Sequence, residues 1–547
     1  MKLLHFLSEN ILLILVLFLL AFIPLYPKLP LLDVKNTWVY IRIEDFLVAF
    51  TLVIYGIQVL RKKAYIKTPL TIPIIIFWLV GAIATISAIF FIFPSIQNAY
   101  PTVAILHFLR RIEYLSLFFV AYAAMRHKSF AKPVTIILAI TLLLVDLYGV
   151  GQKGFIFGEE NRFPAYLTMN EEFAKGIPLK LSALARIPST FAGHYDLAAY
   201  LVMLIAIMGS MVFGFKHWLV KVFFFFSAFS GLVLLLLTAS RTSFAVYLLT
   251  ITFMLFLQKK KILIIPVLIV SIIFAQSFAG ISQRFGSTIS QVDLVVDARS
   301  GKAVGIAKEG EPFVIEDVES TGENLPKGTA YIKLPSQRKG NTATIVYKRT
   351  PVKAGSGSAV TSIQGNFVVQ KVLAYDVSFT TRFQGEWPRA IHAFQRNPFL
   401  GSGYSSISLA TDNNYLRILG EIGIGGFIAF LSIFLVAGIY IKKVLPSVDS
   451  PLSKSLVIGI MAGIFGLGFN AILIDVFEAS KVAFVLWMLM GVALGLLRLY
   501  QKEPIDYFGE ITKVLTSVPA MVVYLTLITF GVFGMSFQNF FMGDDFT

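Results

Sequence analysis

A polar stretch of the chain, residues 381–426, stands directly before a long apolar run. It holds Arg382 near its start and Asp412-Asn413-Asn414 where the apolar run begins. A guanidinium binds anions through paired hydrogen bonds, a carboxylate can act as a general base, and amides can orient a substrate. Polar groups at the mouth of a membrane helix are energetically costly, so their presence in such numbers indicates a function. The stretch predicts a reaction site at a membrane surface, with Asp412 as candidate base and Arg382, Asn413 and Asn414 as candidate substrate-binding residues.

Charged side chains also interrupt the apolar run at residues 102–124, which contains Arg110, Arg111 and Glu113. A charge at mid-depth in a membrane costs roughly 2.5–3.5 kcal/mol on insertion scales, so such residues usually face the interior of a helix bundle. Arg110 and Glu113 can pair on one helix face, whereas Arg111 points about 100° away and needs another partner. Two interpretations remain open: a structural ion pair that fixes helix packing, or arginines that face an anionic substrate.

Two further polar segments lie beside apolar runs. The run RIPSTFAGHYDLAAYL begins at Arg186 and contains His194 and Asp196, and the turn TASRTSF contains Arg241. Asp196 at a helix start is typical of a cap, or of an acid that meets the helix dipole. Arg241 at a tight turn is compatible with an anchor for lipid headgroups. The alternative is that these residues bind substrate.

We predict that one outer half of the membrane holds the basic side chains of these segments. Several guanidinium groups gathered at a bilayer surface would suit a lipid-linked pyrophosphate, because each can bind phosphate oxygens in a bidentate manner. The set consists of Arg111, Arg186, His194, Arg241 and Arg382.

The composition indicates a membrane protein. Of the 547 residues 56% are hydrophobic and 14% are charged, whereas a soluble domain has about 25% charged residues. Cysteine is absent, which excludes disulfides and thiolate metal sites, and no metal or other cofactor is expected. The net charge of +16 comes largely from short loops, where Lys and Arg set orientation and meet anionic lipid headgroups, so we expect membrane lipids and no nucleic acid as partners.

Apolar runs long enough to span a bilayer predict an all-α polytopic membrane protein with about 12–13 transmembrane helices. The first run has no small-residue cleavage site and is expected to remain a helix. The predicted spans are 8–26, 44–60, 70–93, 102–124, 133–151, 194–214, 218–238, 242–257, 262–280, 415–441, 454–474, 480–497 and 517–537.

Basic and neutral loops alternate along these spans. The loops 61–69, 126–132, 258–261 and 442–454 are basic, whereas the turns 94–101 and 475–479 carry no Lys or Arg. The positive-inside rule therefore predicts a cytoplasmic N-terminus, with the polar segments on the external face of the cytoplasmic membrane. One loop fits poorly, because residues 27–43 would be external and yet contain Lys28, Lys35 and Arg42.

Residues 286–376 differ from the rest of the chain. Runs such as AYIKL and TATIVYK alternate apolar and polar residues and are separated by Gly or Pro, which is typical of half-buried strands. We predict a small β-rich soluble insertion in the large external loop. It would either recognise a sugar or partner or be an added module without a role in the chemistry. The predicted division is 1–285 and 415–547 as transmembrane helices, 286–376 as the insertion and 377–414 as an active-site loop.

Three blocks of sequence resemble the O-antigen ligase and O-antigen polymerase superfamily of bacterial polysaccharide enzymes. They are RIPSTFAGHYDLAAYL, LLTASRTSF, and the stretch from Arg382 to Gly426, in which the patterns R-x-x-x-x-W, P-x-L-G-x-G and N-x-Y-L-x-x-x-x-E-x-G-x-x-G occur. Together with the predicted spans they cover roughly residues 180–500. The third block is the most specific.

This resemblance implies a glycosyltransferase that moves a glycan from an undecaprenyl-pyrophosphate donor to a glycan, lipid or protein acceptor outside the membrane. It implies pyrophosphate-binding arginines at Arg186 and Arg241 and a metal-independent inverting transfer. Ligases of the superfamily typically have a His immediately before the Asn of N-x-Y-L, and this chain has Asp412 in that position, before Asn413-Asn414-Tyr415-Leu416. Ligase, polymerase and protein-directed transferase therefore all remain open, and so does the simpler interpretation that Asp412 caps the following helix.

A transporter or flippase for polysaccharide or lipid-linked oligosaccharide is the alternative class, since it would also explain charges within the membrane. Such proteins usually contain related halves and charged residues at several depths. This sequence shows no internal repeat, and its polar clusters gather at one predicted face. No G-x-x-x-x-G-K-[ST] motif occurs, so an activated donor would have to supply the energy.

Overall fold

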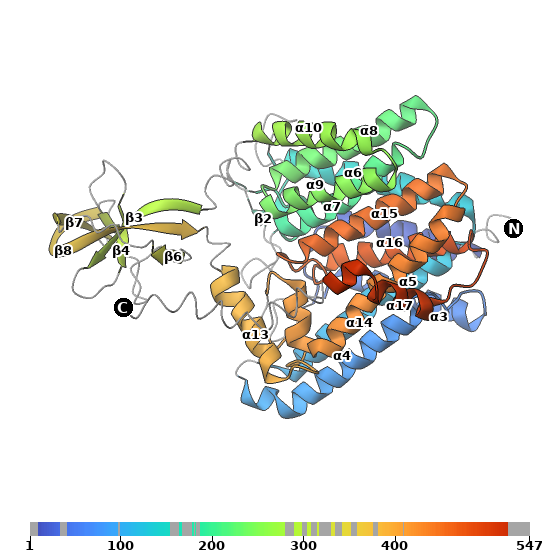
Figure 1. The fold of residues 1–547 in the computed structure, drawn as a ribbon, viewed down its shortest axis with the longest axis horizontal. Coiled ribbons are helices and arrows are strands. Elements are labelled where there is room, and N and C mark those ends of the chain that lie inside the picture. Colours follow the sequence, from blue (N-terminus) through green and yellow to red (C-terminus); the bar gives the residue numbers. More distant parts are fainter. Residues whose placement is uncertain are drawn as a thin grey trace.

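The computed structural model describes residues 9–32, 41–96, 99–153, 163–166, 178–179, 181, 186–278, 289–297, 303–307, 314–316, 330–333, 342–351, 358–375, 381–407 and 410–522. Helices dominate this part of the chain (Figure 1). Eight of them are long and apolar enough to cross a membrane, and three shorter apolar helices accompany them. The chain is thus a multi-pass membrane protein, as its composition predicts.

The helices follow the predicted spans closely up to residue 498. Before the six-stranded sheet they are α2 (Ile11–Leu25), α3 (Ile43–Leu60), α4 (Thr71–Phe91), α5 (Pro101–Ala124), α6 (Ala131–Gly151), α7 (His194–Met211), α8 (Trp218–Leu237), α9 (Arg241–Leu257) and α10 (Ile264–Gln276). After that sheet come a π-helical turn, η4 (Thr381–Glu386), and the helices α13 (Trp387–Arg396), α14 (Asn414–Val444), α15 (Pro451–Asn470), α16 (Ser480–Arg498) and α17 (Tyr507–Leu515). The last predicted span, 517–537, lies mostly outside the described residues.

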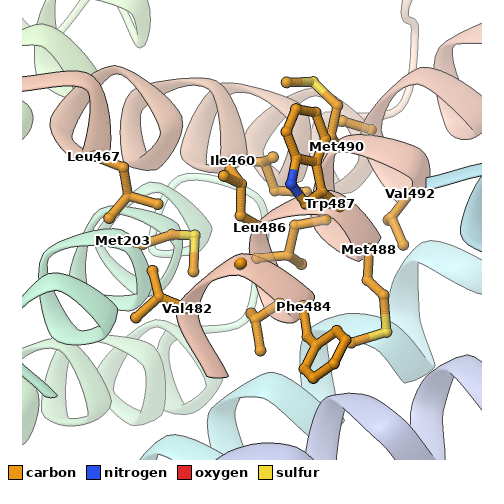
Figure 2. Close-up of a cluster of buried hydrophobic side chains, with 14 of the residues drawn as sticks. Met203, Ile460, Leu467, Val482, Phe484, Leu486, Trp487, Met488, Met490 and Val492 are labelled. Carbon is orange, nitrogen blue, oxygen red and sulfur yellow. The ribbon is translucent and has the colours of Figure 1, made fainter. Parts of the chain in front are cut away.

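Helix α16 is the centre of the bundle, because its residues are buried from Ser480 to Leu497. Figure 2 shows Trp487 and Met490 of α16 packed against Ile460 of α15, with Met203 of α7 close by. Peripheral helices are different. Large apolar side chains on α3, α4, α8 and α10 are exposed, as expected for surfaces that face lipid tails rather than water.

Glycines let the central helices approach each other closely. A Cβ atom added at Gly491 would lie 2.4 Å from the backbone oxygen of Phe118, and one at Gly495 would lie 2.7 Å from that of Tyr122. Small residues four apart bring α16 against α5 in the way that is common in membrane proteins, where van der Waals contact replaces the hydrophobic effect. Any larger side chain at Gly491 would push the two helices apart.

Loops at one end of the bundle are tied together by Arg126, which follows α5. Its guanidinium donates to the backbone oxygen of Glu9 at 2.8 Å and to that of Lys63. In the same turn Lys128 lies 4.0 Å from Asp449, which stands between α14 and α15. The predicted basic loops after α3, α5 and α14 therefore meet at one end of the bundle. The starts of α7, α9 and α14, beside which the predicted site residues lie, are at the other end.

Helix α14 is broken at Gly423, which has φ 65° and ψ −170°. The loop before α14 uses the backbone groups that the break releases: Ser402 donates to the oxygen of Gly420 and Gly403 to that of Glu421, both at 2.8 Å. A Cβ atom at Gly423 would lie 2.3 Å from the oxygen of Phe399, so only glycine fits. Irregular backbone at membrane depth is tolerated here because protein surrounds it. The break holds residues 397–407 against α14.

Strands occur in two places among the described residues. Strands β1 (Ala165–Tyr166) and β2 (Pro178–Leu179) form one antiparallel pair. A six-stranded sheet has the order β4-β3-β8-β7-β5, with β6 paired to β8, and lies beyond the α13 end of the bundle (Figure 1). Strands β5 and β7 pair in parallel, and the other pairings that the structure describes in this sheet are antiparallel. The strands are β3 (Ile289–Asp297), β4 (Ala303–Ala307), β5 (Val314–Glu316), β6 (Ala330–Lys333), β7 (Thr342–Pro351) and β8 (Ser358–Tyr375).

Candidate functional site

Arg382 and Asp412 form an ion pair at the start of α14. Nη2 of Arg382 lies 2.8 Å from Oδ2 of Asp412, and both side chains are largely shielded from solvent. Asp412 has φ 48°, a left-handed conformation that only Gly, Asn and Asp adopt readily. Burial raises the pKa of the Asp412 carboxyl, Arg382 opposes that effect, and the nearby carboxylates of Asp475 and Asp196 add to it.

The carboxylate of Asp475 fixes the turn that carries Asp412. It accepts the backbone N–H groups of Thr411 at 2.7 Å and of Asp412 and Asn413 at 3.2 Å each. Nη1 of Arg417 donates to the same carboxylate at 3.0 Å and holds it in place. Asp475 lies between α15 and α16, so this contact binds that connection to the start of α14.

The interpretation of Asp412 as the helix cap is wrong. Asn413 is the N-cap of α14, since its Oδ1 accepts the N–H of Leu416 at 3.0 Å. The next amide, Asn414, is fully buried; its Oδ1 accepts the N–H of Phe477 at 3.0 Å, and its backbone N–H donates to Ala471 at 2.9 Å. Both predicted substrate-binding amides thus order the backbone, and Asp412 has no capping role.

Arg186 and His194 meet at the start of α7. Nη1 of Arg186 lies 2.5 Å from Nε2 of His194 and 3.3 Å from the hydroxyl of Tyr195. Loop residue Ser189 anchors this segment, since its Oγ donates to the backbone oxygen of Val145 at 2.7 Å. The predicted neighbours Arg186 and His194 therefore act as one polar unit.

Arg241 is the first residue of α9, and the preceding Ser240 caps that helix by accepting the N–H of Ser243. Ser243 also donates to Oδ1 of Asn470, the last residue of α15, at 3.2 Å. Helix α15 packs antiparallel to α9 and to α7: a Cβ atom at Gly466 would approach both Val202 and Thr250. The starts of α7 and α9, with Arg186 and Arg241, therefore lie at the same end of the bundle as the end of α15.

Arg110 and Arg111 are both paired with carboxylates. Arg110 contacts Asp45, at the start of α3, and lies 3.1 Å from Glu113, the partner that their spacing predicts. Arg111 contacts Glu478 and lies over the ring of Tyr404 at 5.3 Å. These contacts favour the structural ion pair among the two interpretations, because each guanidinium already has an anionic partner.

Paired charges also explain the loop that fits the positive-inside rule poorly. Lys28 lies 3.8 Å from Asp196, and Arg42 lies 3.8 Å from Glu44. Both cations are buried, at 6% exposed each, so they meet acids inside the protein rather than lipid headgroups. Burial lowers the pKa of Lys28 to about 8. The third cation of that loop, Lys35, lies outside the described residues.

The predicted capping role of Asp196 is not observed. Gly193 is the N-cap of α7, no side chain makes a capping bond there, and the carboxylate of Asp196 pairs with Lys28 instead.

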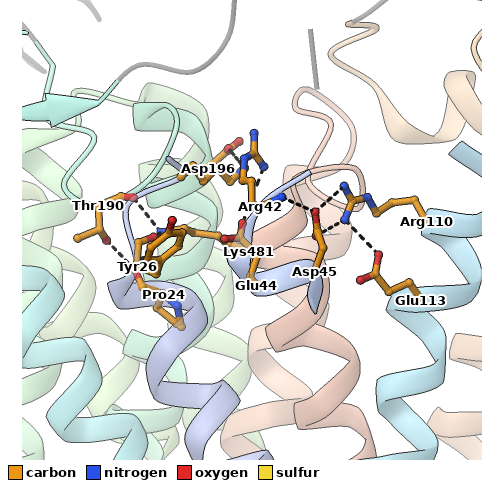
Figure 3. A network of polar contacts seen from close by, with 11 residues as sticks. Pro24, Tyr26, Arg42, Glu44, Asp45, Arg110, Glu113, Thr190, Asp196 and Lys481 are labelled. Atoms are coloured by element: carbon orange, nitrogen blue, oxygen red, sulfur yellow. Dashed lines mark hydrogen bonds and ion pairs between the residues drawn. The ribbon is translucent and has the colours of Figure 1, made fainter. Parts of the chain in front are cut away.

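Lys481 joins the end of α2, the start of α16 and the loop before α7 (Figure 3). Its ammonium donates to the backbone oxygens of Pro24 at 3.1 Å, Tyr26 at 2.6 Å and Thr190 at 2.8 Å, and the side chain is fully buried. Thr190 in turn donates through its Oγ1 to Pro24 at 2.6 Å. The end of α2, the start of α16 and the segment that leads to His194 are thereby fixed to one another.

Replacement of Lys481 by Met is expected to destabilise the protein by at least about 3 kcal/mol, because three buried carbonyl groups lose their shared hydrogen-bond donor. Thermal unfolding of the purified protein in detergent measures the effect. Lys443→Met is the matched control, since Lys443 is 45% exposed where it pairs with Glu510. Equal melting temperatures for the two variants would contradict the structural role of Lys481.

Several residues of this site were missed by sequence reasoning. The turn 475–479 carries no Lys or Arg, and its acids Asp475 and Glu478 pair with Arg417 and Arg111. Lys481 sits in the first turn of an apolar span, and the cost of a charge there was a signal for it. Within the part of the chain that the structure describes, no three His, Asp or Glu side chains converge in a way that could hold a metal ion.

The arrangement offers two chemical capabilities at one end of a membrane bundle. Arg186 with His194, and Arg241 at a helix start, can hold an anionic group. The Asp412–Arg382 pair, just before the start of α14, offers a carboxylate whose position is fixed. In the comparisons with known proteins, no family model matches the chain, and no curated protein matches its sequence.

Proposed function

We propose that the chain is a membrane glycosyltransferase that moves a glycan from an undecaprenyl-pyrophosphate donor to an acceptor hydroxyl or amide, as an O-antigen ligase or polymerase. The carrying observation is the Asp412–Arg382 ion pair, set in a left-handed turn by Asp475 at the end of the bundle where α7 and α9 begin. Such a built turn supports a positioned reactive group, because strained backbone is kept only where the surroundings enforce it.

In this proposal the reaction is a single inverting displacement. The acceptor oxygen attacks the anomeric carbon, the bond from that carbon to the pyrophosphate breaks, and the acceptor proton passes to a carboxylate of the site. Arg186 and Arg241 stabilise the charge that develops on the leaving pyrophosphate. Asp412, held by Arg382, either takes the proton or orients the acceptor. The β-rich sheet belongs to an external insertion, and about 12–13 helices cross the membrane.

Purified protein in liposomes with an undecaprenyl-pyrophosphate oligosaccharide and an acceptor glycan tests the proposal. We expect a lengthened or transferred glycan and release of undecaprenyl pyrophosphate. Movement of the intact donor across the bilayer without bond formation would favour a transporter and refute the transferase. In a strain that lacks the chain, accumulation of single lipid-linked repeat units would indicate a polymerase, whereas finished lipid-linked chains would indicate a ligase.

The proposed topology places the end of the bundle that carries Asp412 outside the cytoplasmic membrane. Because the chain has no cysteine, single cysteines can be placed at Gln395 on α13 and at Ser447 in the basic loop after α14, both of which are exposed. A membrane-impermeant maleimide applied to intact cells is expected to label the first and not the second. The reverse labelling pattern would place the candidate site in the cytoplasm and exclude the proposed reaction.

A further inference from the structure

A second carboxylate stands beside the Arg382–Asp412 pair and has no role in the contacts described so far. Glu386 is the last residue of the π-helical turn η4, four residues after Arg382. It occupies the N-cap position of α13, yet its side chain makes no capping bond. Its Oε2 is buried and has no hydrogen-bond partner among the described residues. A buried carboxylate oxygen without a donor is costly, which points to a ligand or a proton as its missing partner.

The two carboxylates differ in how well they can take a proton. One oxygen of Asp412 is held by Arg382 at 2.8 Å, and such a charge-assisted bond stabilises the ionised form. Glu386 keeps a free oxygen. The charged groups that face it are Asp412 and Asp475 from the loops around the start of α14, and Arg382 and Arg389 from its own segment.

These surroundings bring Glu386 close to neutral pH. Burial raises the pKa of its carboxyl to about 7, the two aspartates act in the same direction, and the two arginines oppose them. A general base works best when its pKa lies near the operating pH, because it is then both ionised and basic enough. Glu386 meets that condition while it sits one turn from the residue that binds Asp412.

We infer that Glu386 is the residue that takes the proton from the acceptor hydroxyl, while Asp412 and Arg382 orient the acceptor. This inference rests on the proposed function. In the step, the O–H bond of the acceptor breaks and its proton moves to Oε2 of Glu386. The acceptor oxygen forms the bond to the anomeric carbon, and the pyrophosphate leaves with the electron pair of the broken bond.

The test is the pH dependence of the transfer rate in the liposome assay. For the wild-type protein we expect the rate to rise as the pH increases through about 7, since the base must be ionised. Glu386→Gln keeps the size of the side chain and is expected to lower the rate about 100-fold and to remove that rise. Glu510→Gln, which changes a carboxylate on α17 near the basic loops, is the matched control and should leave both the rate and the rise unchanged.

Glu386→Ala provides a second measurement. Formate or azide can take the place of a missing carboxylate base, so either anion is expected to restore part of the activity of this variant and none of that of Asp412→Asn. An unchanged rate and pH profile for Glu386→Gln, or an absence of rescue for Glu386→Ala, would overturn the inference. A wild-type protein that transfers no glycan in this assay would instead refute the proposed function itself.

Discussion

Asp412→Asn is expected to lower the rate of glycan transfer by about 100-fold while the protein remains folded, since misplacement of a reacting group by about 1 Å has an effect of that size. Asn is one of the few residues that tolerate the left-handed conformation that Asp412 adopts at φ 48°. The substitution also preserves the backbone N–H that donates to Asp475. It removes only the charge that pairs with Arg382, so the measured effect reports on that pair.

The transfer rate of purified Asp412→Asn in liposomes measures this effect. Asp449→Asn is the matched control, because Asp449 lies at the opposite end of the bundle and its side chain is 77% exposed. A near wild-type rate for Asp412→Asn, with both variants equally stable, would show that the carboxylate neither takes the proton nor orients the acceptor. Glu386 would then remain the inferred proton acceptor, and His194, which contacts the predicted pyrophosphate-binding Arg186, would be the next residue to test as the group that orients the acceptor.

The helices could be predicted because their signal is local. A bilayer requires runs of about 20 apolar residues, and each such run in this chain becomes a helix wherever the structure describes it. Even α5 follows this rule, although Arg110 and Arg111 lie in its middle, because partners elsewhere in the bundle neutralise them. Local spacing also gave the pair of Arg110 with Glu113, three residues apart.

The partners of most charges could not be predicted, because they come from distant parts of the chain. Arg111 and Glu478 are separated by 367 residues, and nothing in the sequence relates one to the other. The same holds for Lys481, whose partners are backbone oxygens that carry no sequence signal at all. Which acid meets which base depends on helix packing, and no local sequence pattern determines that packing.

The cap of α14 shows a different limit. Asp412, Asn413 and Asn414 are all good cap residues, so sequence alone cannot choose among them. The choice depends on the turn that Asp475 imposes, which places Asn413 at the cap and turns Asp412 toward Arg382. Asp412 therefore lies one residue before the cap, and its carboxylate pairs with Arg382 instead of capping α14.

Arg186→Ala and Arg241→Ala are each expected to reduce transfer by about 10²–10³-fold, the loss that follows when one preorganised donor to a developing charge is removed. Arg241 is the first residue of α9, and Arg186 contacts His194, the first residue of α7, at the same end of the bundle, where backbone N–H groups already favour an anion. Arg186 also loses its contact with His194, so its variant should additionally bind the donor less tightly. The substitutions affect side chains that are only half-buried, and we expect normal insertion and stability.

Replacement by Lys separates pyrophosphate binding from a simple need for positive charge. Lysine offers a compact charge in place of a planar fork that can hold two phosphate oxygens, so Arg186→Lys and Arg241→Lys are expected to recover only a small part of the activity. Arg396→Ala is the matched control, because this arginine is exposed on α13 at the same end of the bundle and has no part in the proposed site. Complete rescue by lysine would mean that these positions attract an anion without recognising a pyrophosphate. Full activity in both alanine variants would mean that neither arginine binds the leaving group, which would then need another binding site.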